Sequence, residues 1–362
     1  MALTQVRPEG LGFVNGRRNL IINGAMQVAQ RGTSATASTG YNTVDRFSMT
    51  VANFDNAAFT YGQSSVAPAG FSNSWRIDCT TVETALAADE YSTFYQPIEA
   101  QNLQQIANGS SDAKSLTLSF YVKSNKTGTW GLNLYKPDNT GRQITATYTI
   151  SSANTWEYKT ITFAGDTAGG GIANDNGAGM YVYWALAAGS DYTSSNSTSW
   201  SNYSNAGFLY GHNVNFFDST ANDWAVTGVQ LEVGSNASDF EHRSFGEELA
   251  GCQRYYQEIG HYRHLAQGAR WTTNQVFVTY NLASNMRATP AATATGVPNS
   301  ARYDNGQQAD ATSLVSVGGV EVNTTKAANI TIIWAIGYDP TAALHYVYSN
   351  TDGDLVALDA EL

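Results

Sequence analysis

The segment Ser115–Ser124, SLTLSFYVKS, has the clearest alternation of apolar and polar residues in the chain. Its apolar side chains occupy every second position: Leu116, Leu118, Phe120 and Val122. Alternate side chains of an extended segment point to the same face, so these four share one face. The pattern therefore predicts a β-strand that packs one face against a hydrophobic core.

Similar short segments recur on both sides of this one. They include SWRIDCT (74–80), STFYQPIE (92–99), TWGLNLYK (129–136) and QITATYTIS (143–151). Turn-forming sequences separate them, such as PDNTG (137–141) and SSANT (151–155). Many short alternating strands joined by polar turns predict an antiparallel jelly-roll β-sandwich over residues 19–243. Asn19–Ser34, NLIINGAMQVAQRGTS, is predicted as strand, turn and strand, with the turn at Asn23-Gly24.

The composition limits the class of protein. The 362 residues leave room for two domains, and 42% hydrophobic residues are enough for a core in each. Only 14% of residues are charged and 12% are aromatic, which is typical of all-β extracellular or virion proteins. A net charge of −11 argues against nucleic acid as a partner. No apolar run reaches the length of a membrane span, so we expect no membrane insertion.

The remaining segments predict the domain organisation. Residues 1–18 are predicted as an arm whose Arg7, Arg17 and Arg18 are candidates for docking on another protein, with a frayed terminus as the alternative. No signal peptide is expected in this arm, so a chain made in a bacterium would be made in its cytoplasm. Residues 244–258 are predicted as a linking helix with Ser244 and Glu247 as a capping box. Residues 259–362 are predicted as a second, smaller β-sandwich that oligomerises.

A polar stretch, Ser190–Asn205, carries three aromatic residues: Tyr192, Trp200 and Tyr203. An aromatic ring covers the apolar face of a sugar, while Asn and Ser side chains bond to its hydroxyl groups. These three residues are therefore the candidate glycan-binding residues. The alternative is that their rings pack back onto the sandwich.

Motifs for catalysis or metal binding are weak. His261-x-x-His264 is the one close histidine pair, and no Cys or carboxylate stands at ligand spacing beside it, so no metal site is predicted. Cys79 and Cys252 have no nucleophile context and are predicted to be buried free thiols. We expect no catalytic residues and no cofactor.

Both ends of the first domain resemble bacteriophage proteins. NLIINGAMQVAQRGTS with YNTVDRF (41–47) is similar to the start of a jelly-roll module of phage tail-fibre and related virion proteins. DWAVTGVQLEVGSNASDFEHRSFGEELAGCQRYYQ (223–257) resembles the closing strand and exit helix of the same proteins, and the segments between resemble carbohydrate-binding modules. The resemblance implies a first strand that pairs with the last strand of the domain, and a non-enzymatic homotrimer in the virion.

The leading hypothesis is therefore a tail fibre or fibre-like component that attaches by its arm and binds host surface polysaccharide. A capsid decoration protein shares the same composition and stays open as an alternative. A tail-associated polysaccharide depolymerase is a further alternative, because two carboxylates can converge in a cleft without any local motif.

Overall fold

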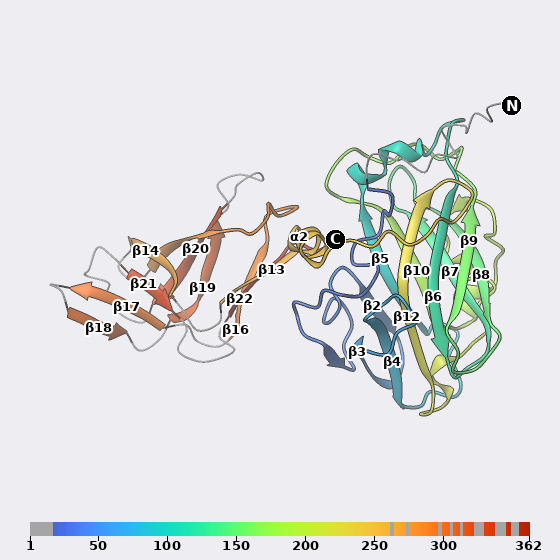
Figure 1. Cartoon of the computed structure of the whole chain (residues 1–362), viewed down its shortest axis with the longest axis horizontal. Coiled ribbons are helices and arrows are strands. Elements are labelled where there is room, and N and C mark those ends of the chain that lie inside the picture. The colour runs from blue at the N-terminus through green and yellow to red at the C-terminus, as the bar shows by residue number, and fades with distance from the viewer. Residues whose placement is uncertain are drawn as a thin grey trace, which may run out of the picture. The chain divides into compact units, whose positions relative to one another are not determined.

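The computed structural model describes the backbone of residues 17–260, 264–272, 275–295, 299–304, 307–311, 314–321, 329–336, 345–348 and 355–362. Side chains are described for residues 17–259, 279–293 and 356–362. These residues form two compact units (Figure 1). Unit 1 holds residues 17–26, 34–40 and 47–243, and unit 2 holds 27–33, 41–46 and the described residues from Ser244 onward.

Unit 1 is a β-sandwich of two six-stranded antiparallel sheets (Figure 1), which confirms the predicted fold class. In order across the sheet, sheet 1 contains β1 (Ser34–Thr36), β3 (Ala58–Ser64), β4 (Ser74–Thr81), β12 (Asp223–Val233), β6 (Leu116–Ser124) and β9 (Glu157–Phe163). Sheet 2 contains β11 (Ser201–Asn202), β8 (Arg142–Ile150), β7 (Gly128–Lys136), β10 (Ala178–Ala188), β5 (Tyr91–Glu99) and β2 (Ser48–Ala52). Short helical turns lie at Ala100–Ile106, Ser190–Thr193 (α1), Asn205–Gly207 and Phe216–Asp218.

Large aromatic side chains fill the space between the two sheets. Trp75 of sheet 1 lies 4.3 Å from Phe94 of sheet 2 between ring centres, and Phe120 lies 5.7 Å from Trp184. All four are at most 1% exposed, so they form the centre of the core. The segment Ser115–Ser124 contributes Phe120 on its apolar face, as its alternation predicts. Both cysteines are buried and unpaired, also as predicted.

The stretch Asn19–Ser34 does not form the predicted strand, turn and strand; among its residues only Ser34, the start of β1, is in a strand. Both backbone groups of Ile22 bond to a side chain and not to a neighbouring strand. The Gln96 side-chain amide accepts from Ile22 N at 2.9 Å and donates to Ile22 O at 2.8 Å. Asn23 and Met26 have φ of 61° and 57°, which bends the backbone out of an extended course. Alternation alone could not reveal a side-chain partner 74 positions away.

The same stretch lies against the last strand of unit 1, as the resemblance implied for the first segment of the domain. Leu20 N donates to Leu231 O at 2.9 Å, and the Asn19 side-chain amide donates to Val229 O at 3.0 Å. A Cβ on Gly24 would lie 2.1 Å from Val229 O, so only glycine allows this approach. The segment thus closes the end of sheet 1 by irregular backbone bonds.

Unit 2 begins with helix α2 (Phe245–Gln253), which carries the predicted capping box between Ser244 and Glu247. The helix is shorter than the predicted 244–258, because β13 already starts at Tyr256 and pairs with β22. Among the described residues, no helix has the length and apolar character needed to cross a bilayer. The predicted arm at 1–16 lies outside the described residues.

Two antiparallel sheets make up the rest of unit 2. The three-stranded sheet contains β13 (Tyr256–Gly260), β22 (Leu355–Asp359) and β16 (Ala291–Thr295). The seven-stranded sheet contains β18 (Gln307–Ala311), β17 (Asn299–Asp304), β21 (His345–Tyr348), β14 (His264–Thr272), β15 (Gln275–Asn281), β20 (Asn329–Ile336) and β19 (Leu314–Glu321). The unit is all-β apart from α2 within the described backbone.

Unit 2 also includes two short N-terminal segments, 27–33 and 41–46. The sequence predicts that both belong to a continuous first domain at 19–243. Arg46 is 1% exposed, forms an ion pair with Glu361 and lies with its guanidinium 3.4 Å from the ring centre of Tyr255. Arg31 bonds to Asp359 at 3.0 Å and to Glu361 at 3.3 Å. Two arginines from the first 46 residues, Arg31 and Arg46, therefore bind the last residues of the chain.

Candidate functional site

The segment 190–212 folds down over part of the outer face of sheet 2, and we call it the cover segment. The Asn133 side-chain amide of β7 donates to Phe208 O at 2.7 Å, and that of Gln143 on β8 donates to Ser204 O at 3.1 Å. The hydroxyl oxygens of Thr145 and Ser197 lie 2.9 Å apart. The polar stretch predicted as a long loop is therefore bonded to the sheet beneath it.

Beside the cover segment, five tyrosine rings lie next to one another on the same face. They are Tyr95 on β5, Tyr181 and Tyr183 on β10, Tyr135 on β7 and Tyr203 on the cover segment, and we call them the tyrosine platform. Successive ring centres along the row are 4.9, 5.7, 5.9 and 4.9 Å apart. The rings thus form one continuous surface.

Strand alternation and register place these rings together. Tyr181 and Tyr183 are two positions apart on β10, so both point away from the core, while Trp184 next to them lies in it. In the pairing of the strands, Tyr183 stands opposite Tyr95 and Tyr181 stands opposite Tyr135. Side chains that stand directly opposite each other on antiparallel strands are close enough for rings to touch.

The platform is partly exposed to solvent. Tyr203 is 40% exposed, and the other four rings are half-buried. Partial burial raises the pKa of Tyr203 to about 12, and burial beside other tyrosines also raises the pKa of Tyr183. The phenol groups of these two residues therefore stay protonated at neutral pH. That of Tyr203 donates to Asn205 Oδ1 at 2.9 Å and can still accept a hydrogen bond.

A row of ring faces with hydroxyl groups at their edges can bind an extended chain of sugars. The apolar C–H face of a pyranose packs on an aromatic ring, and its hydroxyl groups exchange hydrogen bonds with phenol groups. Contacts of this kind are shallow, and several along one chain are needed for useful affinity. The ring faces and phenol groups of the platform are therefore suited to binding.

The structure separates the three predicted glycan-binding residues. Tyr203 belongs to the platform. Tyr192 packs against Tyr91 at 4.5 Å and Phe208 at 6.5 Å between ring centres, which fits the alternative that rings fold back onto the sandwich. Trp200 lies elsewhere, since its indole N–H donates to Ala164 O at 2.7 Å.

Trp200 lines a cavity of about 670 Å³ near β8 and the end of β9. Arg142 at this cavity bonds to both oxygens of Asp166, at 2.8 and 2.9 Å, and to Trp200 O at 3.2 Å. Asp166 is 1% exposed, so this pair is a buried structural contact. The charged groups here are already engaged with each other, and of the two aromatic residues that line the cavity, Phe163 is buried in the core.

The predicted docking arginines have different surroundings. Arg7 lies outside the described residues, and Arg17 is exposed. Arg18 lies against unit 1, where its guanidinium donates to Asp239 O at 2.6 Å and stands 3.8 Å from Glu232. Arg18 therefore stabilises the sandwich in this structure.

No group of three His, Cys, Asp or Glu side chains positioned to hold a metal occurs among the described side chains. The pair His261 and His264, at which no metal site is predicted, falls outside those side chains. His212, the last residue of the cover segment, is buried against β7, where its Nδ1 accepts from Gly131 N at 3.0 Å. Burial lowers the pKa of His212 to about 4, so the ring is neutral at physiological pH.

Sequence reasoning missed four of the five platform residues: Tyr95, Tyr135, Tyr181 and Tyr183. The signal was present, because each stands next to a core residue on a predicted strand and so must face outward. The order of the strands in sheet 2 was the missing information, since β5, β10 and β7 are neighbours in space but distant in sequence.

Comparisons with known proteins give similarity of fold only. No family model matches the chain, and no curated protein matches it. A putative sugar-binding protein from Bacteroides thetaiotaomicron is 13% identical, with 60% of this chain and 100% of that chain covered and a TM-score of 0.33. The family 11 carbohydrate-binding module from Clostridium thermocellum is 12% identical, with 58% and 98% covered and a TM-score of 0.27.

A phage protein is also among the similar structures. The enzymatically active domain of bacteriophage CBA120 tailspike protein 4 is 13% identical, with 59% of this chain covered and a TM-score of 0.30. This chain spans 21% of the length of that tailspike chain. Similarities of this size carry no functional argument, which must come from the residues themselves.

Proposed function

We propose that this chain is a non-enzymatic phage virion protein whose tyrosine platform binds a host surface polysaccharide. The observation that carries the binding is the continuous row of five accessible rings on sheet 2. The proposal of a virion protein rests on the motifs at both ends of unit 1, which resemble tail-fibre proteins. A homotrimeric fibre would present three platforms at once and so strengthen weak contacts.

Binding is tested with the Tyr181→Ala variant and with surface polysaccharide purified from a bacterium that the particle infects. Tyr181 lies at the middle of the row, between Tyr183 and Tyr135, so its removal breaks the surface into two parts. We expect affinity to fall roughly tenfold, the equivalent of about 1.4 kcal/mol. Biolayer interferometry on immobilised polysaccharide measures the change.

The matched control is Phe245→Ala, which removes a ring that is 57% exposed on unit 2. This variant should bind like the unaltered protein. If folded Tyr181→Ala protein binds as tightly as the control, the platform is not the binding site. Release of oligosaccharides during long incubation would instead establish the depolymerase alternative.

The position in the particle needs its own experiment. Immunogold electron microscopy of intact particles, with an antibody raised against the native protein, should place gold on the tail. Gold over the head would support the capsid decoration alternative. Particles without gold, when the same antibody detects the protein in solution, would contradict the virion proposal.

A further inference from the structure

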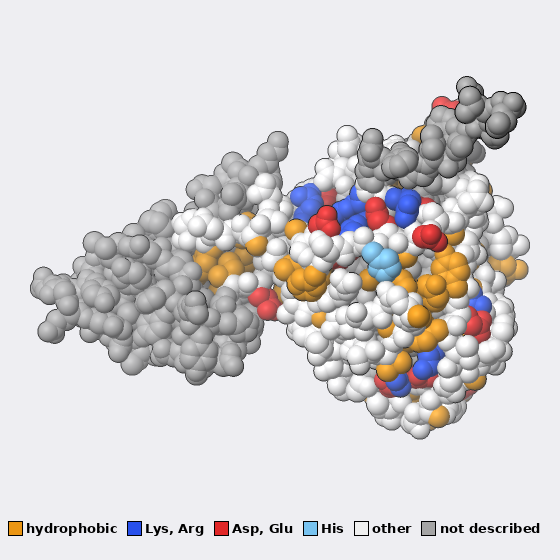
Figure 2. Space-filling view, in the orientation of Figure 1, with side chains coloured by type: hydrophobic (Ala, Val, Ile, Leu, Met, Phe, Trp, Pro, Cys, Tyr) orange, Lys and Arg blue, Asp and Glu red, His pale blue; other side chains and the backbone are white. Residues whose placement is uncertain are grey.

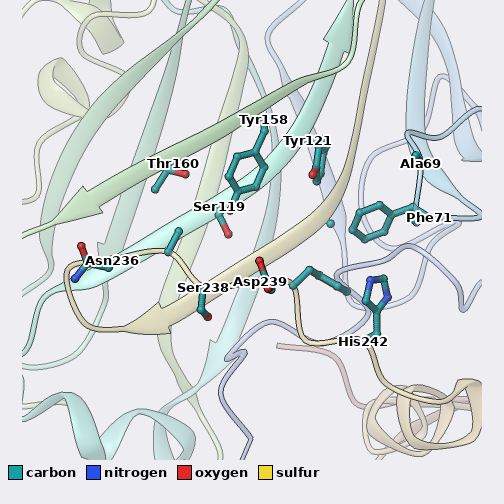
Figure 3. A pocket seen from close by; sticks show the side chains of 14 residues that line it. Ala69, Phe71, Ser119, Tyr121, Tyr158, Thr160, Asn236, Ser238, Asp239 and His242 are labelled. Carbon is teal, nitrogen blue, oxygen red and sulfur yellow. The ribbon is translucent and has the colours of Figure 1, made fainter. Parts of the chain in front are cut away.

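A hollow of about 630 Å³ lies on the outer face of sheet 1, the sheet opposite the tyrosine platform. Figure 3 shows the hollow between strands β6 and β9, which form its floor, and the segments 69–71 and 236–242, which form its wall. We call it the aromatic hollow. All of its lining residues belong to unit 1.

Paired residues on two neighbouring strands form the floor. Tyr121 on β6 stands opposite Tyr158 on β9, with ring centres 5.0 Å apart, and Ser119 stands opposite Thr160. All four point outward, because Phe120 between Ser119 and Tyr121 is fully buried in the core. Tyr158 is 48% exposed, an unusually open position for so large a ring.

Gly228 makes room for one end of the hollow. It has a φ of 61° and lies where the register between β12 and β6 shifts. A Cβ at this position would lie 2.6 Å from Cζ of Phe71 and 3.1 Å from Cδ2 of Tyr121. The ring of Phe71 occupies that space, 5.5 Å from Tyr121 and 5.0 Å from Phe240 between centres.

The wall at 236–242 is held in place by the sandwich. Glu232, which is 4% exposed, accepts from Ser238 N at 2.8 Å and from the Ser238 hydroxyl at 2.6 Å. Arg18 donates to Asp239 O at 2.6 Å. A wall that is already ordered costs little entropy when a ligand binds.

Asp239 and His242 are exposed on this wall, and neither side chain has a hydrogen-bond or ion-pair partner among the described residues. Figure 3 shows the Asp239 carboxylate, the Ser119 hydroxyl and the Tyr158 ring around the same space. Figure 2 shows the surface of the molecule with hydrophobic side chains and a histidine beside a band of charged side chains. Polar groups beside ring faces suit a ligand that has both a polar and an apolar surface.

We propose that the aromatic hollow is a second saccharide site, which binds a neutral pyranose residue. A ring face takes the C–H side of the sugar, and its hydroxyl groups both donate and accept, which matches the mixed carboxylate, imidazole and hydroxyl groups. The site goes beyond the proposed function, since it does not require the tyrosine platform.

The charge of the hollow favours a neutral sugar over an acidic one. The lining residues of the hollow include the carboxylate of Asp239 and no lysine or arginine. An acidic sugar would place its own carboxylate beside that of Asp239, and such a contact is repulsive. Arg18, which holds the wall, is already engaged with Asp239 O and Glu232. A quaternary ammonium would use the rings and the carboxylate but none of the hydroxyl groups.

The experiment uses saturation-transfer NMR on the full chain with six probes: cellotriose, maltotriose, chitotriose, galactotriose, trigalacturonate and choline. The Tyr181→Ala protein serves as the background, which weakens binding at the platform, and the signal that Tyr158→Ala then removes is assigned to the hollow. At least one neutral trisaccharide should bind. Tyr158→Ala in this background should weaken that binding roughly tenfold, whereas Tyr158→Phe should retain most of it.

Asp239→Asn tests the role of charge in the same background. This change should allow trigalacturonate to bind, because it removes the repulsive carboxylate and keeps a hydrogen-bonding side chain. Failure of every neutral trisaccharide to bind overturns the proposal, and so does binding that Tyr158→Ala leaves unchanged or binding of choline alone. Thermal unfolding of each variant verifies that it is folded.

The outcome separates this site from the platform. Polysaccharide binding that is lost in Tyr181→Ala and intact in Tyr158→Ala would leave the platform as the only saccharide site. Polysaccharide binding that is lost in Tyr158→Ala and intact in Tyr181→Ala would leave the hollow as the only saccharide site. Partial loss in each variant, with full loss in the double variant, is the result expected if both faces bind.

Discussion

The two outer faces of the sandwich carry aromatic side chains in different ways. On sheet 2 four of the five platform rings come from alternate positions of three neighbouring strands. On sheet 1 the strands supply Tyr121 and Tyr158, whereas Phe71 and Phe240 come from connecting segments. The first face is a row of touching rings, and the second is a hollow with a wall.

This difference shows what strand alternation can and cannot build. Alternation places rings side by side on a sheet, and side-by-side rings suit an extended sugar chain. A concave site also needs a raised wall and a place where the sheet lacks a side chain. Gly228 at the bulge of β12 provides that place on sheet 1.

The largest effect is expected at acidic pH and comes from His212, which is buried against sheet 2, where its Nδ1 accepts from Gly131 N. Burial lowers the pKa of His212 from an ordinary 6.5 to about 4. Between these values the unfolded chain binds more protons than the folded chain, so the free energy of unfolding falls as the pH falls. The loss should approach about 3 kcal/mol at pH 4.

Urea denaturation at pH 7 and pH 4.5 measures this loss. The control is His212→Gln, whose stability should change less between the two pH values because the titrating group is gone. Equal changes in the two proteins would show that His212 is not the group responsible.

On sheet 1, Gly228→Ala should be the most damaging small change. The new Cβ would meet the Phe71 ring at 2.6 Å, and a φ of 61° is strained for alanine. We expect a loss of about 2 kcal/mol in the free energy of unfolding, measured by chemical denaturation. A variant as stable as the parent would mean that the rings of the hollow relax at no cost.

Tyr192 and Tyr203 of the cover segment allow a sharper comparison of packing with binding. Tyr192→Ala should lower stability by about 1 kcal/mol and leave polysaccharide affinity unchanged, because its ring packs on Tyr91 and Phe208. Tyr203→Ala should reduce affinity about fivefold with little loss of stability, since its ring is 40% exposed. Interferometry measures the affinity and thermal unfolding measures the stability. Equal changes of affinity and of stability in the two variants would contradict the prediction.

The smallest effect is expected for Gly246→Ala on helix α2, and it has the opposite sign. No atom lies within 4 Å of a Cβ at this position, and alanine is the better helix former. The free energy of unfolding should rise by about 0.5–1 kcal/mol. A decrease would mean that the space at Gly246 is occupied in solution.

Several elements of both units were predictable because their signals are local. The segment Ser115–Ser124 became β6 with its apolar face in the core, and Ser244 begins α2 with the predicted capping box. The stretch Asn19–Ser34 was not predictable in the same way. Its backbone bonds go to Gln96 and Leu231, and the alternation of apolar residues says nothing about those partners.

The candidate site was predictable only in part for the same reason. Tyr203 was identified from the polar stretch around it, yet its ring acts with Tyr135, which lies on a different strand. Trp200 has similar neighbours in the sequence, but it lines the cavity near β8 and the end of β9 and not the platform. Residue type and local polarity do not determine which ring stands beside which.

The amino-acid sequence by itself determined the class of fold, the faces of the main strands and the start of the linking helix, because these depend on neighbours a few positions apart. The tertiary structure alone decided that Arg46 pairs with Glu361, and that tyrosines of three strands form one surface on sheet 2. Such contacts join residues tens to hundreds of positions apart. They form only where the packing of the whole chain brings the strands together, so no local pattern specifies them.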